Sequence, residues 1–266
     1  MNDQVDDVIG HILNSIKDVG LKKDPFPHFE ACPVFPGAYY KEILANLPDD
    51  DAYTPAGETG LVTSSAYKER GIISLEAPNL ANLPDAIRPF WIMLSRKLLA
   101  RAFMEQLVES FDRDIKIRFA EKASLSIWPN AYLCRDWPGY NLGPHTDSYQ
   151  KVVSLIFYLP ENPESPELGT SLYIPRDPDF KCEGGPHYDF AEFTKVKTIQ
   201  YMPNTVFGFV KSTKSFHGVE PLSAEHRSRD VLLYNVYQKG FKIKEIPYIQ
   251  KRDDDISNSK SSPNLI

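Results

Sequence analysis

Residues 143–160 read GPHTDSYQKVVSLIFYLP, in which a His-Thr-Asp motif stands directly before a long apolar run. The run KVVSLIFYL is rich in β-branched and aromatic residues, which favours a strand. In an extended segment residues i and i+2 face the same way, so His145 and Asp147 can present an imidazole and a carboxylate to one point. The stretch predicts either a metal site at the mouth of a strand or an ordinary polar turn.

A series of similar short segments surrounds this run from residue 114 onward. They are separated by Gly, Pro, Asn or charged turns, which is typical of successive strands. The segments are IKIRF, SLSIW, AYLC, KVVSLIFYL, TSLYI, KTIQYM, TVFGFV, SFHGV and DVLLYNVY. About eight or nine strands after a helical N-terminal part predict an α+β, mainly β protein with a double-stranded β-helix (jelly roll) core.

The N-terminal part of the chain carries mostly helical patterns. Apolar residues recur at close to the helical period over residues 3–18, and residues 84–112 carry the strongest such pattern. PGAYYKEILANLP predicts a short helix, whereas PFPHFEACPVFP predicts a strand between prolines. These helices form the predicted support for the β core.

The length of 266 residues suits one large domain with a sizeable core. We expect a single domain over residues 1–250, in which 1–113 is helical or irregular support and 114–250 is the β-helix core. Residues 251–266 are polar and low in apolar content, and they predict a disordered tail.

The composition narrows the class of protein. The net charge is −6 and the pI is about 5.6, which gives no sign of a nucleic-acid surface. Three cysteines lie far apart, which favours a reducing compartment over a disulfide framework. The N-terminus is acidic and broken by charges, unlike a signal peptide, and no stretch approaches the roughly 18 apolar residues of a membrane span. We expect a soluble cytoplasmic protein that binds neither nucleic acid nor membrane.

The metal interpretation depends on a third ligand, because His-x-acid occurs at His28, His145 and His187. Only the copy at His145 stands at the head of a strand run within the predicted barrel. The one further histidine placed on such a strand is His217, with four predicted strands between it and His145. In a jelly roll this count brings the two strands side by side, so His145, Asp147 and His217 form the predicted triad. Two histidines and one carboxylate with open positions are typical of non-haem Fe(II).

A site that holds a dicarboxylate cosubstrate also needs a fixed cation, for which arginine is suited. Arg227 and Arg229 are the candidates, because both stand at the start of the last predicted strand. By alternation Arg229 shares a strand face with Val231 and Asn235.

The residues quoted so far resemble the Fe(II)/2-oxoglutarate-dependent oxygenases, especially their prolyl-hydroxylase-like branch. The resemblance covers roughly residues 123–238 and rests on PHTD, FYLP, PNTVFGFV and FHGVEP with an arginine-led strand after it. It implies that His145, Asp147 and His217 are the iron ligands and that they are catalytic. The cofactors it implies are Fe(II) and the cosubstrates 2-oxoglutarate and O2.

The same resemblance assigns the anchor for the far carboxylate of 2-oxoglutarate to Arg229 rather than Arg227, because an apolar strand follows Arg229 at once. It implies that Tyr158 hydrogen-bonds that carboxylate. Two features depart from the family: the spacing from His217 to Arg229 is slightly long, and Val231 stands where some relatives have serine.

The resemblance implies a dioxygenase that hydroxylates an unactivated C–H bond of a small polar organic substrate, with succinate and CO2 as co-products. Candidate substrate contacts are Arg135, Trp137, Tyr140 and Asn235. Candidate lids are the polar stretch at 50–75 and the loop at 176–195. Two alternatives stay open: a cupin-like metalloenzyme that does not use 2-oxoglutarate, and a non-catalytic jelly-roll binding module. Neither the substrate nor the oligomeric state can be inferred from these residues.

Overall fold

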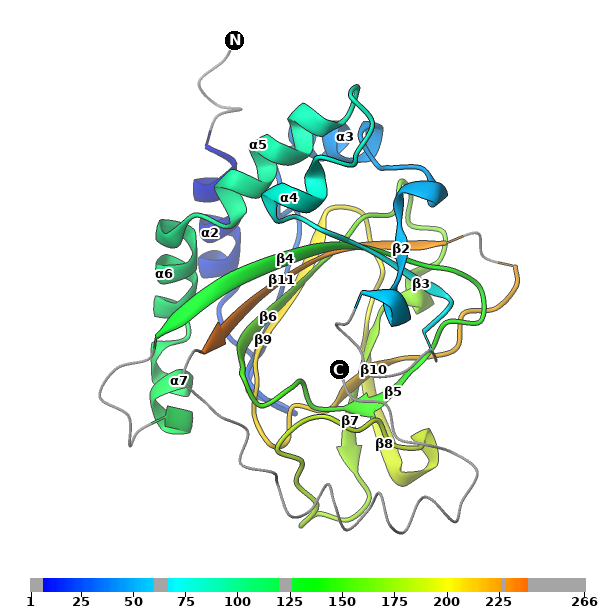
Figure 1. Ribbon diagram of the computed structural model, residues 1–266. Helices are drawn as coiled ribbons and strands as arrows, with labels where there is room; N and C mark the ends of the chain where they lie inside the picture. Colours follow the sequence, from blue (N-terminus) through cyan, green and yellow to red (C-terminus); the bar gives the residue numbers. More distant parts are fainter. Residues whose placement is uncertain (1–6, 60–66, 120–125, 226–227, 239–266) are drawn as a thin grey trace.

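The computed structural model describes residues 7–59, 67–119, 126–225 and 228–238. Its centre is a pair of antiparallel sheets, one above the other (Figure 1). The larger sheet has seven strands in the order β1-β9-β6-β11-β4-β3-β2, and the smaller has four in the order β5-β10-β7-β8.

Most strands come from the second half of the chain and most helices from the first half. The strands are β1 (His28–Ala31), β2 (Thr54–Pro55), β3 (Arg70–Ser74), β4 (Ile127–Asp136), β5 (Leu142–His145), β6 (Lys151–Tyr158), β7 (Thr170–Pro175), β8 (Phe193–Ile199), β9 (Thr205–Val210), β10 (His217–Val219) and β11 (Arg229–Gln238). The helices are α2 (Val8–Val19), α3 (Gly37–Ala45), α4 (Ala77–Leu80), α5 (Arg88–Leu98), α6 (Arg101–Glu109) and α7 (Asp112–Phe119).

The strand order confirms the predicted double-stranded β-helix. From β4 to β11 the chain places β4, β6, β9 and β11 in the large sheet and β5, β7, β8 and β10 in the small one. The strands β6 to β9 are the four that separate the two predicted histidine ligands. They return the chain so that β10 pairs with β5, and His217 lies directly opposite His145.

Each face of the large sheet is buried, but against different partners. Helices α2, α5 and α6 lie along its outer face (Figure 1). There Leu232, Tyr234 and Val236 of β11 pack with apolar side chains of these helices in one hydrophobic cluster, which we call the helical core. The other face packs against the small sheet and includes Val231 of β11. Strand alternation therefore aims Arg229 and the other odd-numbered residues of β11 between the two sheets.

Two local predictions were wrong. IKIRF was expected as a strand, but it lies in α7, whose first turn carries Asp112 and Asp114. Acidic residues favour a helix N-terminus, and an I-x-I-x-F pattern over so few residues does not distinguish a strand from a helix. SLSIW and AYLC, expected as two strands, belong to the single strand β4 as far as they are described. The predicted tail 251–266 lies outside the described residues.

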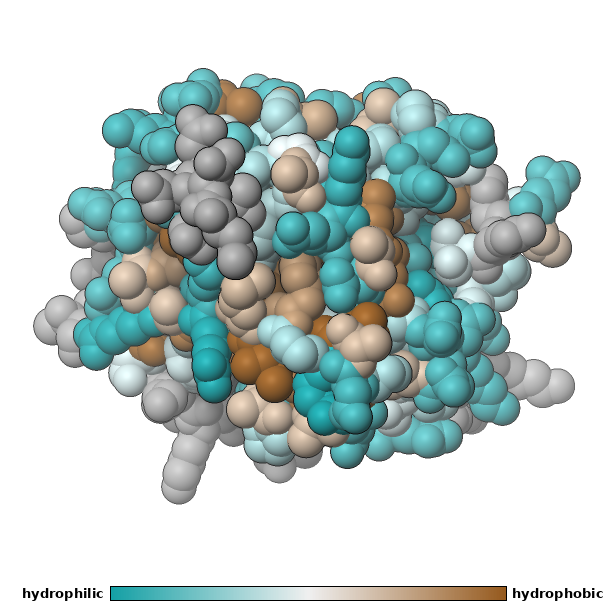
Figure 2. All heavy atoms as spheres, turned by 90° about the horizontal axis from the view of Figure 1, so that it is seen from above, coloured by the Kyte–Doolittle hydropathy of each residue, from teal (hydrophilic) through white to brown (hydrophobic). Residues whose placement is uncertain are grey.

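The surface seen from above α3, α4 and α5 is mostly hydrophilic, and the hydrophobic residues visible there gather mainly near its middle (Figure 2). Met93 on α5 is one of the large apolar residues exposed on the described surface, at 41%. Among the described helices, none has the length and apolar character needed to cross a membrane.

Candidate metal centre

Three side chains, two from neighbouring strands and one from a turn, meet between the sheets. His145 ends β5, Asp147 follows it in the turn before β6, and His217 begins β10. One ligand atom from each lies within 4.8 Å of the other two, and all three residues are buried. The rings of His145 and His217 have centroids 4.3 Å apart. The structure thus brings together the three residues that the sequence predicted as a triad.

Backbone carbonyls fix the tautomer of both histidines. The Nδ1 atoms of His145 and His217 each lie 3.0 Å from a carbonyl oxygen, that of Gly143 and that of Ser215 respectively. A carbonyl oxygen can only accept, so each Nδ1 carries the proton and each Nε2 presents a lone pair. Burial is the largest cause that lowers the pKa of both imidazoles, so both are neutral near pH 7.

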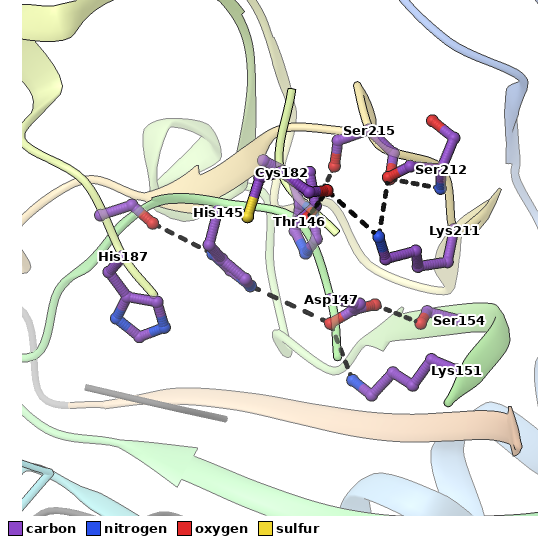
Figure 3. A network of polar contacts seen from close by, with 12 residues as sticks. His145, Thr146, Asp147, Lys151, Ser154, Cys182, His187, Lys211, Ser212 and Ser215 are labelled. Carbon is purple, nitrogen blue, oxygen red and sulfur yellow. Dashed lines mark hydrogen bonds and ion pairs between the residues drawn. The ribbon is translucent and has the colours of Figure 1, made fainter. Parts of the chain in front are cut away.

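Asp147 completes the set as an anion that two neighbours hold in place (Figure 3). Lys151 Nζ donates to its Oδ1 at 2.9 Å, and Ser154 Oγ donates to its Oδ2 at 2.6 Å. Burial alone would raise the pKa of Asp147, but the Lys151 ammonium and the other groups nearby outweigh burial and lower the pKa below its ordinary value. The sequence analysis missed Lys151 and Ser154, although both stand within the strand that follows the motif.

These residues fit a first-row divalent metal. The donors are two neutral imidazole nitrogens and one carboxylate oxygen, the set that suits Fe(II) with positions left open for other ligands. Backbone hydrogen bonds orient both rings, and Lys151 and Ser154 orient the carboxylate, as outer-shell groups do at metal sites. Among the described residues no other cluster of three potential ligands was found.

A buried charged cluster occupies another part of the space between the sheets. Arg229 Nη1 donates to Asp136 Oδ2 at 2.7 Å, and Arg70 Nη2 donates to the same oxygen at 2.9 Å. Arg229 also donates to the backbone oxygen of Leu168, which ties the large sheet to the segment just before β7. Two guanidinium groups share one carboxylate, so this trio carries one uncompensated positive charge. The sequence predicted Arg229 but not Arg70, and it did not indicate that Asp136 pairs with Arg229.

Tyrosines surround this cluster. The Arg229 guanidinium carbon lies 5.7 Å from the ring centroid of Tyr158, whose hydroxyl oxygen accepts from the Thr170 N–H at 3.1 Å. The Arg70 guanidinium carbon lies 4.3 Å from the ring centroid of Tyr140. The Tyr140 hydroxyl is buried and has no hydrogen-bond partner among the described residues. A polar atom buried without a partner beside excess positive charge is suited to an anionic ligand.

The other predicted substrate contacts divide between the two faces of the large sheet. Asn235 lies on the interior face opposite Ser154, and its Nδ2 donates to Asn130 Oδ1 at 3.1 Å. Arg135 lies on the opposite, helical face, where it pairs with Asp230 at 2.7 Å. That position removes Arg135 from the site.

Trp137 also packs away from the triad. Its ring meets Tyr53 edge-on at 6.3 Å and belongs to the helical core. Both faces of β4 are buried, so the apolar pattern of the strand did not reveal which residues face the site. The alternative anchor Arg227 lies outside the described residues.

His187 is a further group that the sequence analysis set aside. Its ring centroid lies 4.8 Å from that of His145, and the Tyr67 hydroxyl lies 2.7 Å from its Nδ1. Burial is the largest cause that lowers the pKa of His187 to about 4, and the Arg70 guanidinium adds to it. His187 comes from the predicted lid loop 176–195, so that loop reaches the edge of the triad.

No protein-family model and no curated protein matches the chain. Solved structures with some likeness include a Pseudomonas putida prolyl-4-hydroxylase, 13% identical over 87% of this chain and 100% of that one, with a TM-score of 0.48. A 2OG-Fe(II) oxygenase family oxidoreductase from Burkholderia pseudomallei is 11% identical over 86% and 89%, with a TM-score of 0.47. A Trichoplax adhaerens prolyl hydroxylase, bound to a hypoxia inducible factor peptide fragment, is 12% identical over 89% and 91%, with a TM-score of 0.45. Because these identities and TM-scores are low, the functional assignment rests on the side chains of the site and not on these structures.

Proposed function

We propose that the protein is an Fe(II)- and 2-oxoglutarate-dependent dioxygenase that hydroxylates a C–H bond of a small polar organic compound, with succinate and CO2 as co-products. One observation carries the proposal. The His145–Asp147–His217 donor set and the Arg229 cluster lie between the same two sheets.

Strand β6 relates the two parts of the site. Ser154, which contacts Asp147, and Tyr158, which lies beside Arg229, are four residues apart on its interior face. At about 3.3 Å per residue their Cα atoms are about 13 Å apart. An extended arginine side chain and a bound dicarboxylate can together span that separation. This spacing supports an arrangement in which one end of 2-oxoglutarate lies at the triad and the other at Arg229.

Each part of the chain then has a definite task. His145, Asp147 and His217 would hold Fe(II), which together with 2-oxoglutarate supplies the activation of O2 for C–H oxidation. Arg229, as a planar cation, would bind the far carboxylate through its remaining N–H groups. The Tyr140 hydroxyl, which has no hydrogen-bond partner in the described part of the chain, can donate to the same carboxylate. Burial of all these groups excludes bulk water from the reaction.

The wall beside the triad supports an uncharged polar substrate. Asn235 donates to Asn130, whose Nδ2 donates in turn to the Tyr132 hydroxyl at 2.9 Å. The Tyr132 proton is therefore available to a substrate. Trp128 and Tyr237, at the end of the same wall, stack with centroids 5.4 Å apart. Amides and aromatic faces with no formal charge suit hydroxyl or amide groups better than a carboxylate or an ammonium.

Anaerobic addition of Fe(II) and 2-oxoglutarate tests the cofactor pair. We expect a weak visible charge-transfer band in the wild-type protein and none in His145→Ala or His217→Ala. Succinate release against a panel of neutral polyols, amides and amino acids then tests the reaction. A protein that gives the same spectrum with and without its two histidines would contradict the proposal.

The ion pair between Asp136 and Arg229 favours one second candidate, a cupin-like metalloenzyme that does not use 2-oxoglutarate. In that case Asp136 is the permanent partner of Arg229, and no cosubstrate carboxylate is required there. An Arg229→Gln variant distinguishes the two. The dioxygenase requires a large loss of 2-oxoglutarate affinity in this variant, whereas the cupin-like enzyme requires metal-dependent turnover without any added keto acid.

A further inference from the structure

A buried lysine contacts the carboxylate of the candidate metal site. Lys151 begins β6 and is only 9% exposed, with its Nζ 2.9 Å from Asp147 Oδ1. This is the carboxylate oxygen that lies 4.0 Å from His145 Nε2, on the side of the metal donors. The two groups form a buried ion pair, in which the Lys151 ammonium faces the Asp147 carboxylate.

This contact changes the charge of the donor set. Two neutral imidazoles and one carboxylate alone carry one negative charge, but the Lys151 ammonium cancels it. A second buried ammonium, Lys211, lies near His217. Its Nζ donates to the backbone oxygens of Cys182 at 3.4 Å and Ser212 at 3.1 Å (Figure 3). The surroundings of the triad are therefore more positive than the ligands alone would make them.

Positive surroundings have opposite effects on the affinity for a metal ion and the affinity for 2-oxoglutarate. A divalent metal ion placed in a neutral, buried donor set leaves two positive charges uncompensated, which is costly in a medium of low dielectric constant. The dianion of 2-oxoglutarate reduces this excess of positive charge, because one of its carboxylates would lie at the metal ion and the other at Arg229. A fixed positive charge at Lys151 therefore repels the metal ion and attracts the cosubstrate.

We infer that Lys151 is a charge-balancing residue that weakens binding of the metal ion alone and strengthens binding of 2-oxoglutarate to the metal-loaded site. The inference rests on the proposed function, since it assigns both ligands to this site. Its consequence is that the protein holds its metal ion firmly only when the cosubstrate is bound with it.

Isothermal titration calorimetry with Co(II) as the metal probe tests the inference without any turnover. Two dissociation constants are measured: Co(II) for the protein alone, and 2-oxoglutarate for the Co(II)-saturated protein. The variant Lys151→Gln retains a hydrogen-bond donor for Asp147 but removes the charge, and Lys151→Arg keeps the charge. Lys195→Gln makes the same charge change at a lysine whose side chain is 49% exposed, on the strand β8.

We expect Lys151→Gln to bind Co(II) about tenfold more tightly and 2-oxoglutarate about tenfold more weakly than the wild type. Lys151→Arg and Lys195→Gln should stay close to the wild type. A lysine that merely orients Asp147 would give the opposite sign for Co(II), because its loss would weaken metal binding. Lys151→Met, which also lacks the charge, replaces the glutamine variant if thermal melting shows that the latter does not fold.

Two failures are distinguishable. If Lys151→Gln leaves Co(II) affinity unchanged or lowers it while the wild type binds both ligands, the role of Lys151 is refuted and the proposed function stands. If the wild type binds no Co(II) even in the presence of 2-oxoglutarate, or binds it as well after His145→Ala and His217→Ala, the proposed function itself is refuted.

Discussion

The carboxylate of Asp136 provides the sharpest test of the buried charge cluster. It is fully buried and accepts hydrogen bonds from both Arg70 and Arg229. The change Asp136→Asn keeps the size of the side chain but leaves two buried guanidinium groups without a counter-ion. Breaking a buried ion pair in this way costs about 3–5 kcal/mol of folding free energy.

Urea unfolding followed by circular dichroism measures this loss directly, and the melting temperature should fall by about 6–20 °C for a chain of this size. The matched control is Asp85→Asn, which removes a carboxylate from Arg88 at 2.6 Å on the surface, where the aspartate side chain is 91% exposed. An exposed pair contributes about 0.2–1 kcal/mol, so the control should be nearly neutral.

The melting temperature of the same variant in the presence of the cosubstrate is a second measurement. If the excess positive charge is the anchor for a dicarboxylate, 2-oxoglutarate with Co(II) should raise the melting temperature of Asp136→Asn. An Asp136→Asn protein within 1 kcal/mol of the wild type would refute the reasoning, because the two arginines would then need no internal counter-ion.

Three further predictions concern separate parts of the molecule. Gly184 has a φ of 130°, and an added Cβ would lie 2.4 Å from the backbone oxygen of Asp147. The change Gly184→Ala should therefore displace Asp147 and weaken Co(II) binding at least about tenfold in calorimetry. The change Gly37→Ala, at an open position, should leave Co(II) binding unchanged. Arg135 pairs with Asp230 on the helical face of the large sheet, so Arg135→Gln should lower the free energy of unfolding by about 1–3 kcal/mol. The dissociation constant for 2-oxoglutarate should stay within about twofold of the wild type. A large loss of 2-oxoglutarate affinity would contradict this placement. Burial lowers the pKa of His28, so the unfolded chain binds a proton at this residue more readily than the folded protein does. Above the unfolded pKa of about 6.5 this difference in proton binding has no effect on stability. As the pH drops below that value, the free energy of unfolding falls. Urea titrations should show a shallower loss between pH 6.5 and 5 for His28→Phe, and an unchanged slope would count against the assignment.

The sequence alone was sufficient for the features that depend on local pattern and on counting. Spacing of two residues placed His145 and Asp147 on one side of an extended segment. Four strand-like segments before His217 were enough to place it beside His145, because jelly-roll topology determines which strands pair. Alternation along β11 assigned Arg229 and Asn235 to the same face, and the structure places both between the sheets.

The partners of those residues were decided only by the tertiary structure. Arg70 and Asp136 are 66 positions apart, and no local pattern indicates that Asp136 pairs with both Arg70 and Arg229. Arg135 was misplaced because β4 is covered on both faces, so hydrophobicity does not mark the interior side. Lys151 looked like the first residue of a strand, and only the turn after Asp147 brings its ammonium onto the carboxylate. Periodicity is encoded within a few residues of chain, whereas charge pairing depends on distances in space that only the packed sheets determine.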